Sequence, residues 1–168
     1  TQWRDRLDVL VNNASSFYPT PVGTITEAQW DDLIGTNLKA PLFLSQAALP
    51  ALRAAGGAIV NIVDVHSTHP LRDHPVYGPA KAGLAMLTRS LAKDLAPDVR
   101  VNGVSPGAIL WPENDMPEDT RAAILKQVPL ARPGDPADIA GAVLFLVRDA
   151  TYVTGQIIAV DGGRSIGW

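Results

Sequence analysis

Four short apolar runs, each separated from the next by enough residues for a helix, constrain the fold of this chain more than any other feature. The runs cover residues 7–11, 58–63, 99–104 and 156–160. Apolar runs of this length are typical of strands, and strands that alternate with helical segments build parallel sheets. We therefore predict an α/β domain with a parallel sheet.

The first long helix is predicted to begin after Thr26, because Thr26 and Gln29 match the capping-box pattern of a helix start. Pro41 follows four residues after Asn37. Proline has no N–H, so the Asn37 carbonyl loses its helical partner and the helix is expected to kink there. That carbonyl would be available to a water molecule or a lysine, although a plain proline kink gives the same pattern.

The second predicted helix begins near Tyr77 and ends at Pro97, with Lys81 one turn after Tyr77 on the same face. A cation beside a phenol favours the phenolate and lowers the phenol pKa from about 10. Such a phenol can donate or accept a proton near neutral pH. A helix start with a solvated lysine would give the same pair, so the assignment needs other polar residues to converge on Tyr77.

The connection after the third apolar run, residues 108–134, is long and rich in proline and polar groups. We predict a short helix at residues 118–126 within it. A further helix is predicted to begin at Asp135, since Pro136 suits the first helical position. Long connections of this kind are often lids or substrate loops. Residues 1–168 are thus predicted to form one domain with 108–134 as its substrate loop or lid.

Small, polar or turn-forming residues follow each apolar run. Ligands bind at the carboxyl ends of the strands in an open parallel sheet, so these residues predict a cofactor crevice along one edge. No G-x-G-x-x-G turn and no Walker-type phosphate loop occurs in the 168 residues. Either the chain is the later part of a larger domain or it binds no dinucleotide. The strand-end residues are Asn12, Asn13, Ala14 and Ser15, then Asp64, then Ser105, Pro106 and Gly107, and last Asp161, Gly162 and Gly163.

The composition argues against several classes of function. The net charge is −3 and no basic patch stands out, so we expect no nucleic-acid partner. The sequence has no cysteine, hence no disulfide and no thiolate metal site. No apolar run is long enough to span a membrane, and the first residues do not resemble a signal peptide. These features favour a cytoplasmic enzyme.

Taken together, the motifs resemble those of the short-chain dehydrogenase/reductase family in order and spacing. The resemblance covers essentially the whole chain and implies a Rossmann-like, doubly wound parallel sheet. The chain would then lack the N-terminal βαβαβα portion, the usual dinucleotide-binding half, which explains the absent glycine motif. Family members are usually tetramers, so we expect a homotetramer in which residues 165–168 reach a neighbouring active site. The motifs are Asn12-Asn13-Ala14, Asn37, Tyr77-x-x-x-Lys81, Pro106-Gly107 and Asp161-Gly162-Gly163.

Within the family the chain is most similar to the bacterial pteridine reductases. Residues 13–21 closely match their pterin-binding segment, and residues 106–113 resemble the bacterial members. Asp64 stands thirteen residues before Tyr77, where the family at large has serine and pteridine reductases have aspartate. The resemblance implies an NADPH-dependent reductase of dihydropterin or dihydrofolate-like rings. A general carbonyl reductase of the same fold is the alternative.

The resemblance also implies a role for each catalytic residue. Tyr77 would donate a proton to the pterin ring, while Lys81 would lower the Tyr77 pKa and hold the nicotinamide ribose. Asp64 would bond the pterin or pass protons to Tyr77 through water, and a turn cap is its alternative role. The Asn37 carbonyl would hold a water molecule beside Lys81.

The binding residues follow from the same resemblance. Phe17 would stack on the pterin and Ser15 would bond its polar edge, and Trp111 is assigned to the same substrate site. The alternatives are that Phe17 covers the core and Ser15 caps a turn. The exact ring substrate and the choice of NADPH over NADH cannot be read from this chain. The NADPH-lining set is Asn13, Ala14, Tyr77, Lys81, Ser105, Pro106 and Gly107.

Two functions of other classes compete with a reductase. Asp64, His66, His69, Asp73 and His74 form a segment dense in metal-ligand types, which a metal hydrolase could use. That function would leave the other strand-end residues without a role, so we expect no metal. Alternatively, the chain is a non-catalytic fragment completed by a separate chain that carries the N-terminal portion, because an unpaired strand edge favours association.

Overall fold

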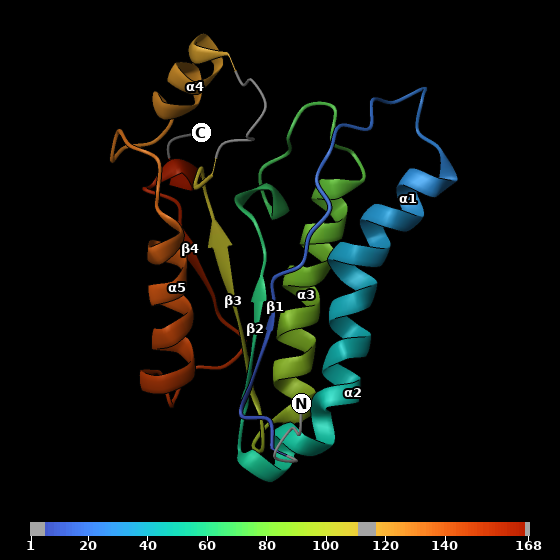
Figure 1. The fold of residues 1–168 in the computed structure, drawn as a ribbon, viewed down its shortest axis with the longest axis vertical. Helices are drawn as coiled ribbons and strands as arrows, with labels where there is room; N and C mark the ends of the chain where they lie inside the picture. Colours follow the sequence, from blue (N-terminus) through green and yellow to red (C-terminus); the bar gives the residue numbers. More distant parts are fainter. Residues whose placement is uncertain (1–5, 111–116, 167–168) are drawn as a thin grey trace.

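The computed structural model describes residues 6–110 and 117–166, which form a four-stranded parallel sheet covered by helices on both faces (Figure 1). The strands are β1 (Val9–Asn12), β2 (Ala58–Ile62), β3 (Arg100–Pro106) and β4 (Ile157–Val160), paired in that order. Each strand lies within two residues of a predicted apolar run at either end. The predicted α/β fold class, a Rossmann-like parallel sheet, is confirmed.

Helices α2 and α3 lie against one face of the sheet, and α5 lies against the other (Figure 1). Ile59 and Val101 point to the α2 and α3 side, whereas Val60 and Val104 pack on the α5 side. This alternation is the period of two expected for strands buried on both faces. The helices are α1 (Glu27–Ile34), α2 (Ala40–Ala55), α3 (Tyr77–Leu95), α4 (Glu118–Leu125) and α5 (Pro136–Leu144).

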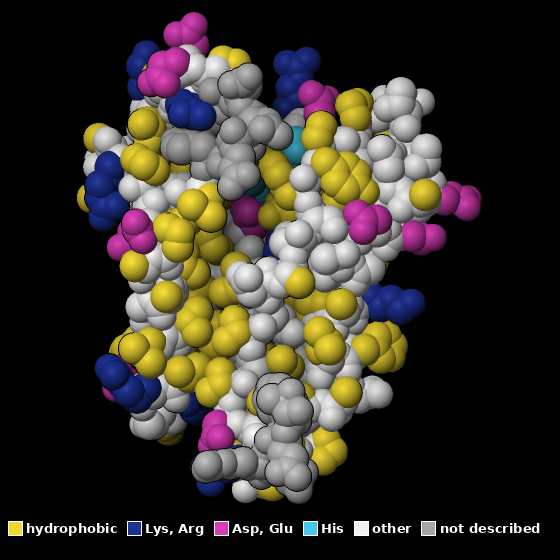
Figure 2. Space-filling view, in the orientation of Figure 1, with side chains coloured by type: hydrophobic (Ala, Val, Ile, Leu, Met, Phe, Trp, Pro, Cys, Tyr) yellow, Lys and Arg dark blue, Asp and Glu magenta, His cyan; other side chains and the backbone are white. Residues whose placement is uncertain are grey.

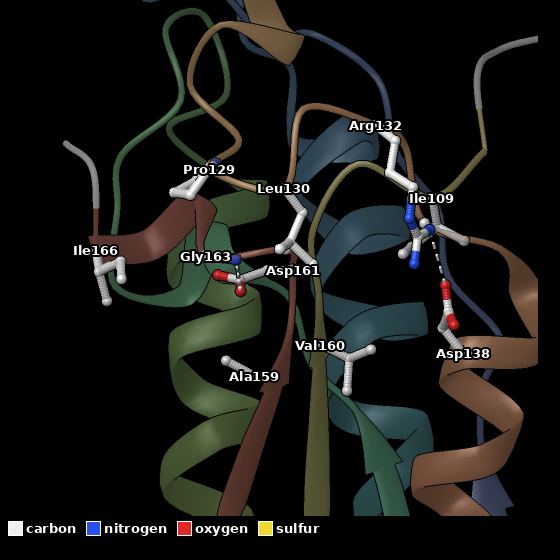
Figure 3. Close-up of a pocket in the computed structure, with 12 residues that line it drawn as sticks. Ile109, Pro129, Leu130, Arg132, Asp138, Ala159, Val160, Asp161, Gly163 and Ile166 are labelled. Atoms are coloured by element: carbon white, nitrogen blue, oxygen red, sulfur yellow. Dashed lines mark hydrogen bonds and ion pairs between the residues drawn. The ribbon is translucent and has the colours of Figure 1, made fainter.

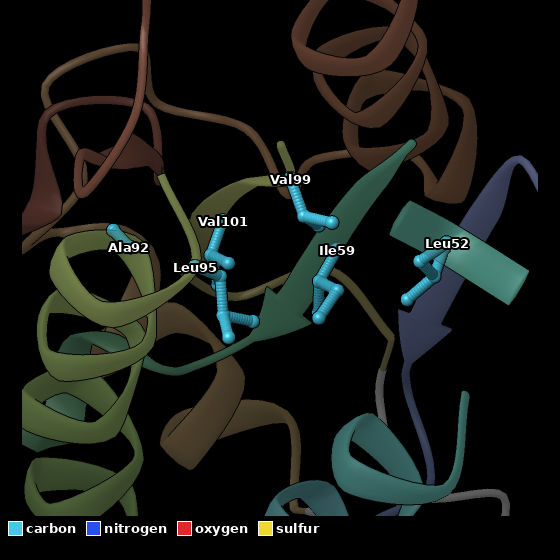
Figure 4. Close-up of a cluster of buried hydrophobic side chains, with 6 residues drawn as sticks. All are labelled: Leu52, Ile59, Ala92, Leu95, Val99 and Val101. Atoms are coloured by element: carbon cyan, nitrogen blue, oxygen red, sulfur yellow. The ribbon is translucent and has the colours of Figure 1, made fainter. Parts of the chain in front are cut away.

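The core under α2 and α3 is a cluster of fully or nearly fully buried aliphatic side chains (Figure 4). Leu52 of α2 and Leu95 of α3 pack on Ile59 and Val101 of the sheet. Each such side chain contributes about 1.5–3 kcal/mol when it leaves water, so this cluster fixes how both helices sit on the strands. The first turn of α3, which carries Tyr77, is thereby held at the carboxyl end of the sheet.

The predicted helix starts are confirmed by their caps. The Thr26 hydroxyl accepts from the Gln29 N–H at 3.3 Å, and the Gln29 side chain accepts from the Thr26 N–H at 2.9 Å. Asp135 caps α5 in the same way, with Pro136 at the first helical position. Helix α3 begins at Tyr77 and ends before Pro97, as the sequence predicts. The predicted short helix within residues 118–126 corresponds to α4.

The helix kink predicted at Pro41 is replaced by a helical turn that is wider than an α-helical one. Residues Gly35–Lys39 form one π-helical turn between α1 and α2, closed by a hydrogen bond from the Ala40 N–H to the Gly35 carbonyl. Pro41 therefore occupies the first turn of α2, where its missing N–H costs nothing. Asn37 lies inside this turn and is completely buried.

A chain of buried polar groups crosses the core between the sheet and α3. The Asn12 side-chain Nδ2 donates to the Asn61 side-chain Oδ1 at 2.8 Å, and the Asn61 Nδ2 donates to the Thr88 hydroxyl at 2.9 Å. The Thr88 hydroxyl in turn donates to the Leu84 carbonyl at 2.8 Å. Buried polar groups require such partners, so this chain ties β1, β2 and α3 together.

No helix within residues 6–110 or 117–166 has both the length and the apolar character needed to cross a bilayer.

Candidate active site

A cavity of about 620 Å³ opens where the carboxyl ends of β2 and β3 meet the start of α3. Figure 2 shows a hollow near the upper end of this face of the molecule, with acidic, basic and histidine side-chain atoms at its depth. The cavity brings together four predicted site residues, Phe17, Asp64, Tyr77 and Gly107, and adds His66, His74 and Arg164. Ligand binding at this edge is what an open parallel sheet favours.

Asp64 and Tyr77 are joined by a direct hydrogen bond at the wall of the cavity. The Tyr77 hydroxyl donates to Asp64 Oδ2 at 2.8 Å, and Asp64 Oδ1 accepts from the His66 backbone N–H at 2.8 Å. Asp64 also caps the short 3₁₀ turn Val65–Ser67. Its alternative role as a turn cap is therefore compatible with its place at the site. Both carboxylate oxygens are therefore fixed in place.

The direction in which the Tyr77 pKa is shifted corrects the sequence-based prediction. Tyr77 is only 4% exposed, and burial raises the pKa of its phenol well above the usual value. The Asp64 charge and its hydrogen bond raise it further, while Ser15 acts weakly in the opposite direction. The expected lowering by Lys81 is wrong for this arrangement, because burial and the carboxylate beside the hydroxyl both disfavour the phenolate. Tyr77 is a protonated donor at neutral pH.

Lys81 lies one helical turn beyond Tyr77 along α3, with its Nζ near the face of the Tyr77 ring. Its Nζ donates to the Ile62 carbonyl at 3.0 Å and stands 5.7 Å from the centroid of the Tyr77 ring. The side chain is 2% exposed, and burial lowers the Lys81 pKa to about 8, against an opposing influence of Asp64. Lys81 is thus a buried cation near a phenol, as predicted, although it is not bonded to the hydroxyl.

Asn37 contributes through its side chain, whereas the sequence pattern pointed only to its backbone carbonyl. Its Oδ1 accepts from the Ser15 hydroxyl at 2.6 Å, and its Nδ2 donates to the Ser16 and Leu33 carbonyls, both at 2.9 Å. These bonds fasten the loop after β1 to the π turn. The prediction that the Asn37 carbonyl holds a water molecule beside Lys81 stays a prediction.

Phe17 projects from that loop over the cavity. Its ring meets the Tyr77 ring edge-on, with centroids 4.8 Å apart, and stacks on His74 with centroids 4.7 Å apart. Phe17 is 53% exposed, so it covers the cavity rather than the core. His74 was considered in the sequence only as a metal ligand, and its place in this ring cluster could not be found without the fold.

The predicted cofactor residues lie at and beside the same edge. Asn13 and Pro106 line a second, largely apolar cavity of about 660 Å³ together with Ile62, whose carbonyl holds Lys81. Gly107 lines the first cavity, so the end of β3 separates the two. Ala14 is exposed on the adjoining loop and Ser105 is buried within β3. Trp111 lies outside the described residues.

The histidines have local partners instead of a shared ion site. His66 Nδ1 lies 3.0 Å from the His69 carbonyl, His69 Nδ1 lies 2.9 Å from the Thr68 hydroxyl, and His74 Nδ1 lies 2.7 Å from the Arg72 carbonyl. Within the described parts of the chain, no group of three or more histidine or carboxylate side chains is placed to hold a metal ion. The metal-hydrolase alternative gains no support there.

Comparison with known proteins identifies the family. A family model described as enoyl-(acyl carrier protein) reductase matches residues 1–165. A 3-oxoacyl-[acyl-carrier-protein] reductase from Thermotoga maritima is 38% identical over 165 residues, which are 96% of this chain and 67% of the relative. Pteridine reductase 1 from Leishmania tarentolae is 40% identical over 185 residues, covering 96% and 64% of the two chains.

A solved structure shows the same fold. A Sinorhizobium meliloti protein described as a short-chain alcohol dehydrogenase superimposes with a TM-score of 0.92 at 37% identity, over 97% of this chain and 67% of that one. The chain belongs to the short-chain dehydrogenase/reductase family. It spans between 60% and 67% of the length of the curated relatives it matches. Short-chain reductases use NAD(P)(H), which agrees with the predicted class of cofactor.

The site fits the nicotinamide end of such a cofactor. The second cavity offers an apolar wall with Asn13 and Pro106 at the strand ends, next to the cavity that contains Tyr77. In a short-chain reductase, Lys81 would hold the ribose and Asn13 and Pro106 would line the nicotinamide. The sequence carries no glycine-rich phosphate loop, so these residues would account for that end of the cofactor alone.

Proposed function

We propose that the protein reduces a carbonyl group with NADPH and that Tyr77 supplies the proton. The observation that supports this most is the hydrogen bond from the Tyr77 hydroxyl to Asp64, at the wall of a cavity that adjoins the proposed nicotinamide site. The raised pKa keeps the phenol protonated at neutral pH, which is the state an acid catalyst needs. The relatives named as acyl-carrier-protein reductases favour a carbonyl over a ring substrate.

Each residue then has a part in moving one proton. The Tyr77 hydroxyl turns from Asp64 toward the substrate oxygen and donates its hydrogen there. NADPH, when bound, supplies hydride to the carbonyl carbon. Lys81, whose Nζ is 5.7 Å from the ring centroid, stabilises the phenolate that remains. Asn37 and Ser15 hold the loop that carries Phe17, so that the ring closes the cavity over the reacting groups and excludes water.

The test is the loss of NADPH absorbance with methyl acetoacetate, using the protein expressed as its gene encodes it. We expect turnover with NADPH to exceed turnover with NADH. Tyr77→Phe should lower kcat by about 100-fold or more, the usual contribution of a general acid, while NADPH binding measured by fluorescence changes little. Equal turnover in this variant would contradict the role of Tyr77.

Reduction of a dihydropterin is a second candidate, favoured by two side chains. Asp64 places a carboxylate in the cavity, which can accept hydrogen bonds from the amino and ring N–H groups of a pterin, and Phe17 offers an exposed ring face for stacking. Asp64→Ser keeps a hydroxyl that can accept from Tyr77, so it should reduce turnover of dihydrobiopterin at least about tenfold more than that of methyl acetoacetate. Equal losses on both substrates would remove the case for a pterin.

We also propose a homotetramer, on the strength of exposed apolar side chains along the outer helices. Trp30 of α1, Phe43 and Leu44 of α2 and Met86 of α3 are each half exposed or more. Exposed apolar side chains on neighbouring elements often mark an interface. Light scattering of the purified protein gives its mass, and Phe43→Glu should reduce the assembly size. A monomeric wild-type protein would contradict this proposal.

The alternative of a separate completing chain has its own observation. Strand β1 stands at the edge of the described sheet, and Val11 on it is 40% exposed. A strand edge of this kind is a template for pairing with further backbone. Recovery of a second, smaller polypeptide with the protein would support that alternative, and an intact mass from a single polypeptide would exclude it.

A further inference from the structure

His74 stands in the wall between the cavity that contains Tyr77 and a larger cavity beside it. We call the first, of about 620 Å³, the substrate cavity. The second has a volume of about 880 Å³ and is lined by the loop before α3 and by the first turns of that helix. His66, Leu71 and His74 line both cavities. Four prolines line the second one, which we call the proline-lined cavity, namely Pro21, Pro70, Pro75 and Pro79.

The imidazole ring of His74 is held in one orientation. Its Nδ1 donates to the Arg72 carbonyl at 2.7 Å, because a carbonyl oxygen can only accept. One face of the ring stacks on Phe17, with centroids 4.7 Å apart and planes inclined by 17°. The Tyr77 ring lies nearly perpendicular to it, with centroids 6.5 Å apart. The His74 Nε2 is buried and has no hydrogen-bond partner within the described residues, so we infer that the ring acts at this wall through its shape.

The backbone that carries His74 is supported as well. Asp73 has a φ of 59°, in the left-handed region that is costly for a residue with a Cβ. The Asp73 carbonyl accepts from the Thr20 N–H at 2.6 Å, and Thr20 is completely buried. This bond and the stack of Phe17 on His74 join the loop before α3 to the loop after β1. The wall is therefore supported by two separate segments of the chain.

The neighbouring cavities decide where a longer substrate could extend. The largely apolar cavity with Asn13 and Pro106 is the proposed nicotinamide site, so the cofactor would occupy it. A cavity of about 570 Å³ beside β4 has Leu130 and Asp161 on its wall and shares no lining residue with the substrate cavity (Figure 3). Among these spaces, the proline-lined cavity is the one that a chain leaving the substrate cavity would reach, and His74 stands between the two.

We propose that His74, together with Leu71 in the same wall, sets a length limit for the substrate chain on the ketone side of the reacting carbonyl. This inference rests on the proposed carbonyl reductase function and adds a specificity-determining residue to it. A substrate whose carbonyl oxygen lies at the Tyr77 hydroxyl would direct one of its two chains toward His74. Short chains would fit in front of the imidazole ring, and longer chains would meet it. Removal of the ring would join the two cavities and admit the longer chains.

The test uses three methyl esters that differ only in the length of the alkyl chain, namely methyl acetoacetate, methyl 3-oxohexanoate and methyl 3-oxooctanoate. The measured quantity is the ratio of kcat/KM for the longest ester to kcat/KM for the shortest, with NADPH. The wild type should prefer the shortest ester. His74→Ala should raise the ratio about tenfold or more, since the added methylenes gain an apolar wall. An unchanged ratio in His74→Ala would overturn the proposal, and so would a wild type that reduces the longest ester as well as the shortest.

Two matched variants separate the shape of the ring from other effects. His74→Phe removes both nitrogens and keeps a flat ring, so its ratio should stay within about twofold of wild type. Val22→Ala removes apolar bulk from the proline-lined cavity, away from the shared wall and at a side chain that is 84% exposed. Its ratio should also stay within about twofold of wild type. A rise in either variant equal to that of His74→Ala would refute the role of the ring as a wall.

A binding measurement keeps this proposal distinct from the reductase function. If the wild type reduces methyl acetoacetate and His74→Ala leaves the ratio unchanged, the length limit is refuted and the reductase function stands. If the wild type reduces none of the three esters, the reductase function fails. Calorimetry with methyl 3-oxooctanoate then tests the wall by itself. Tighter binding to His74→Ala than to the wild type would support the wall, and equal or weaker binding would refute it.

A folding defect would not imitate the expected result, because it would lower activity with every ester, whereas the proposal requires a gain with the longest. Thermal unfolding shows whether His74→Ala is folded at the assay temperature. If it is unfolded, Leu71→Ala takes its place, since Leu71 lines both cavities at the same wall. A raised ratio in Leu71→Ala would then support the proposal, and an unchanged ratio would refute it.

Discussion

Tyr77 gives its hydroxyl hydrogen to Asp64 Oδ2 across 2.8 Å, although the two residues sit at opposite ends of a loop between β2 and α3. The bond makes the carboxylate, and not the neighbouring lysine, the strongest charged influence on the phenol. A serine at position 64 could also accept the hydrogen, but it would add no charge. Asp64 therefore adds to the effect of burial in keeping Tyr77 protonated, and it also orients the hydroxyl.

Asp64→Asn should lower the Tyr77 pKa. A negative charge beside a phenol disfavours the phenolate, so removal of that charge makes ionisation easier. Tyrosinate absorbance measured during an alkaline titration reports ionisation, and the difference between Asp64→Asn and Asp64→Asn/Tyr77→Phe isolates Tyr77 from the other two tyrosines. A Tyr77 titration that stays at the wild-type pH, or moves higher, would contradict the assigned cause.

Lys81 should make the stability of the protein rise with pH in an alkaline window. Burial lowers its folded-state pKa to about 8 from 10.5, so between these values the unfolded chain binds more protons than the folded one. Stability then increases with pH through that window, by up to about 3 kcal/mol for this one group. Urea unfolding at several pH values, with Lys81→Met as the reference, isolates the effect. A difference between the two proteins that is independent of pH would refute it.

Thr88→Val should destabilise the fold by about 1–3 kcal/mol, because the buried Asn61 amide loses its acceptor. The two side chains have nearly the same shape, so packing changes little. Thr151→Val, at an exposed position, is the control and should change stability by less than about 0.5 kcal/mol. Urea unfolding measures both. Equal effects of the two substitutions would show that the polar chain through the core contributes nothing.

Phe17→Ala should weaken substrate binding while changing the stability of the fold little. The ring is 53% exposed and contacts chiefly the rings of Tyr77 and His74, so we expect a stability loss of no more than about 1.5 kcal/mol. The KM for substrate should rise several-fold, since the cavity loses its cover. Tyr152→Ala removes a fully exposed aromatic ring elsewhere and should alter neither quantity. A large loss of stability with an unchanged KM would assign Phe17 to the core instead.

The elements that local signals specify were predictable from the sequence. Thr26 with Gln29 and Asp135 with Pro136 mark helix starts through contacts within one turn. Each strand coincides closely with a short segment rich in apolar residues. The placement of Asp64 and Gly107 around one cavity followed from the rule that ligands bind at the carboxyl ends of parallel strands, and the family resemblance added Tyr77.

The features of the site that could not be predicted from the sequence depend on contacts between distant elements. The Tyr77 pKa depends on burial and on which charge lies at the hydroxyl, and a helical repeat reveals only that Lys81 shares its face. The Asn37 side chain was missed because its partner, Ser15, comes from the loop after β1. Arg164 was missed because its burial follows from where the turn after β4 folds back.

The strand register constrains the number of residues between each strand and the site residue that follows it. Asn12, Asn61 and Gly103 stand side by side on three adjacent strands. Three residues farther on, the chain reaches Ser15, Asp64 and Pro106 respectively. Each residue of extended chain advances by about 3.3 Å, so one insertion or deletion inside any of these three-residue steps would shift a site group by that distance. The length of these steps should therefore hardly vary among homologous genes, and gaps in their sequences should gather beyond them.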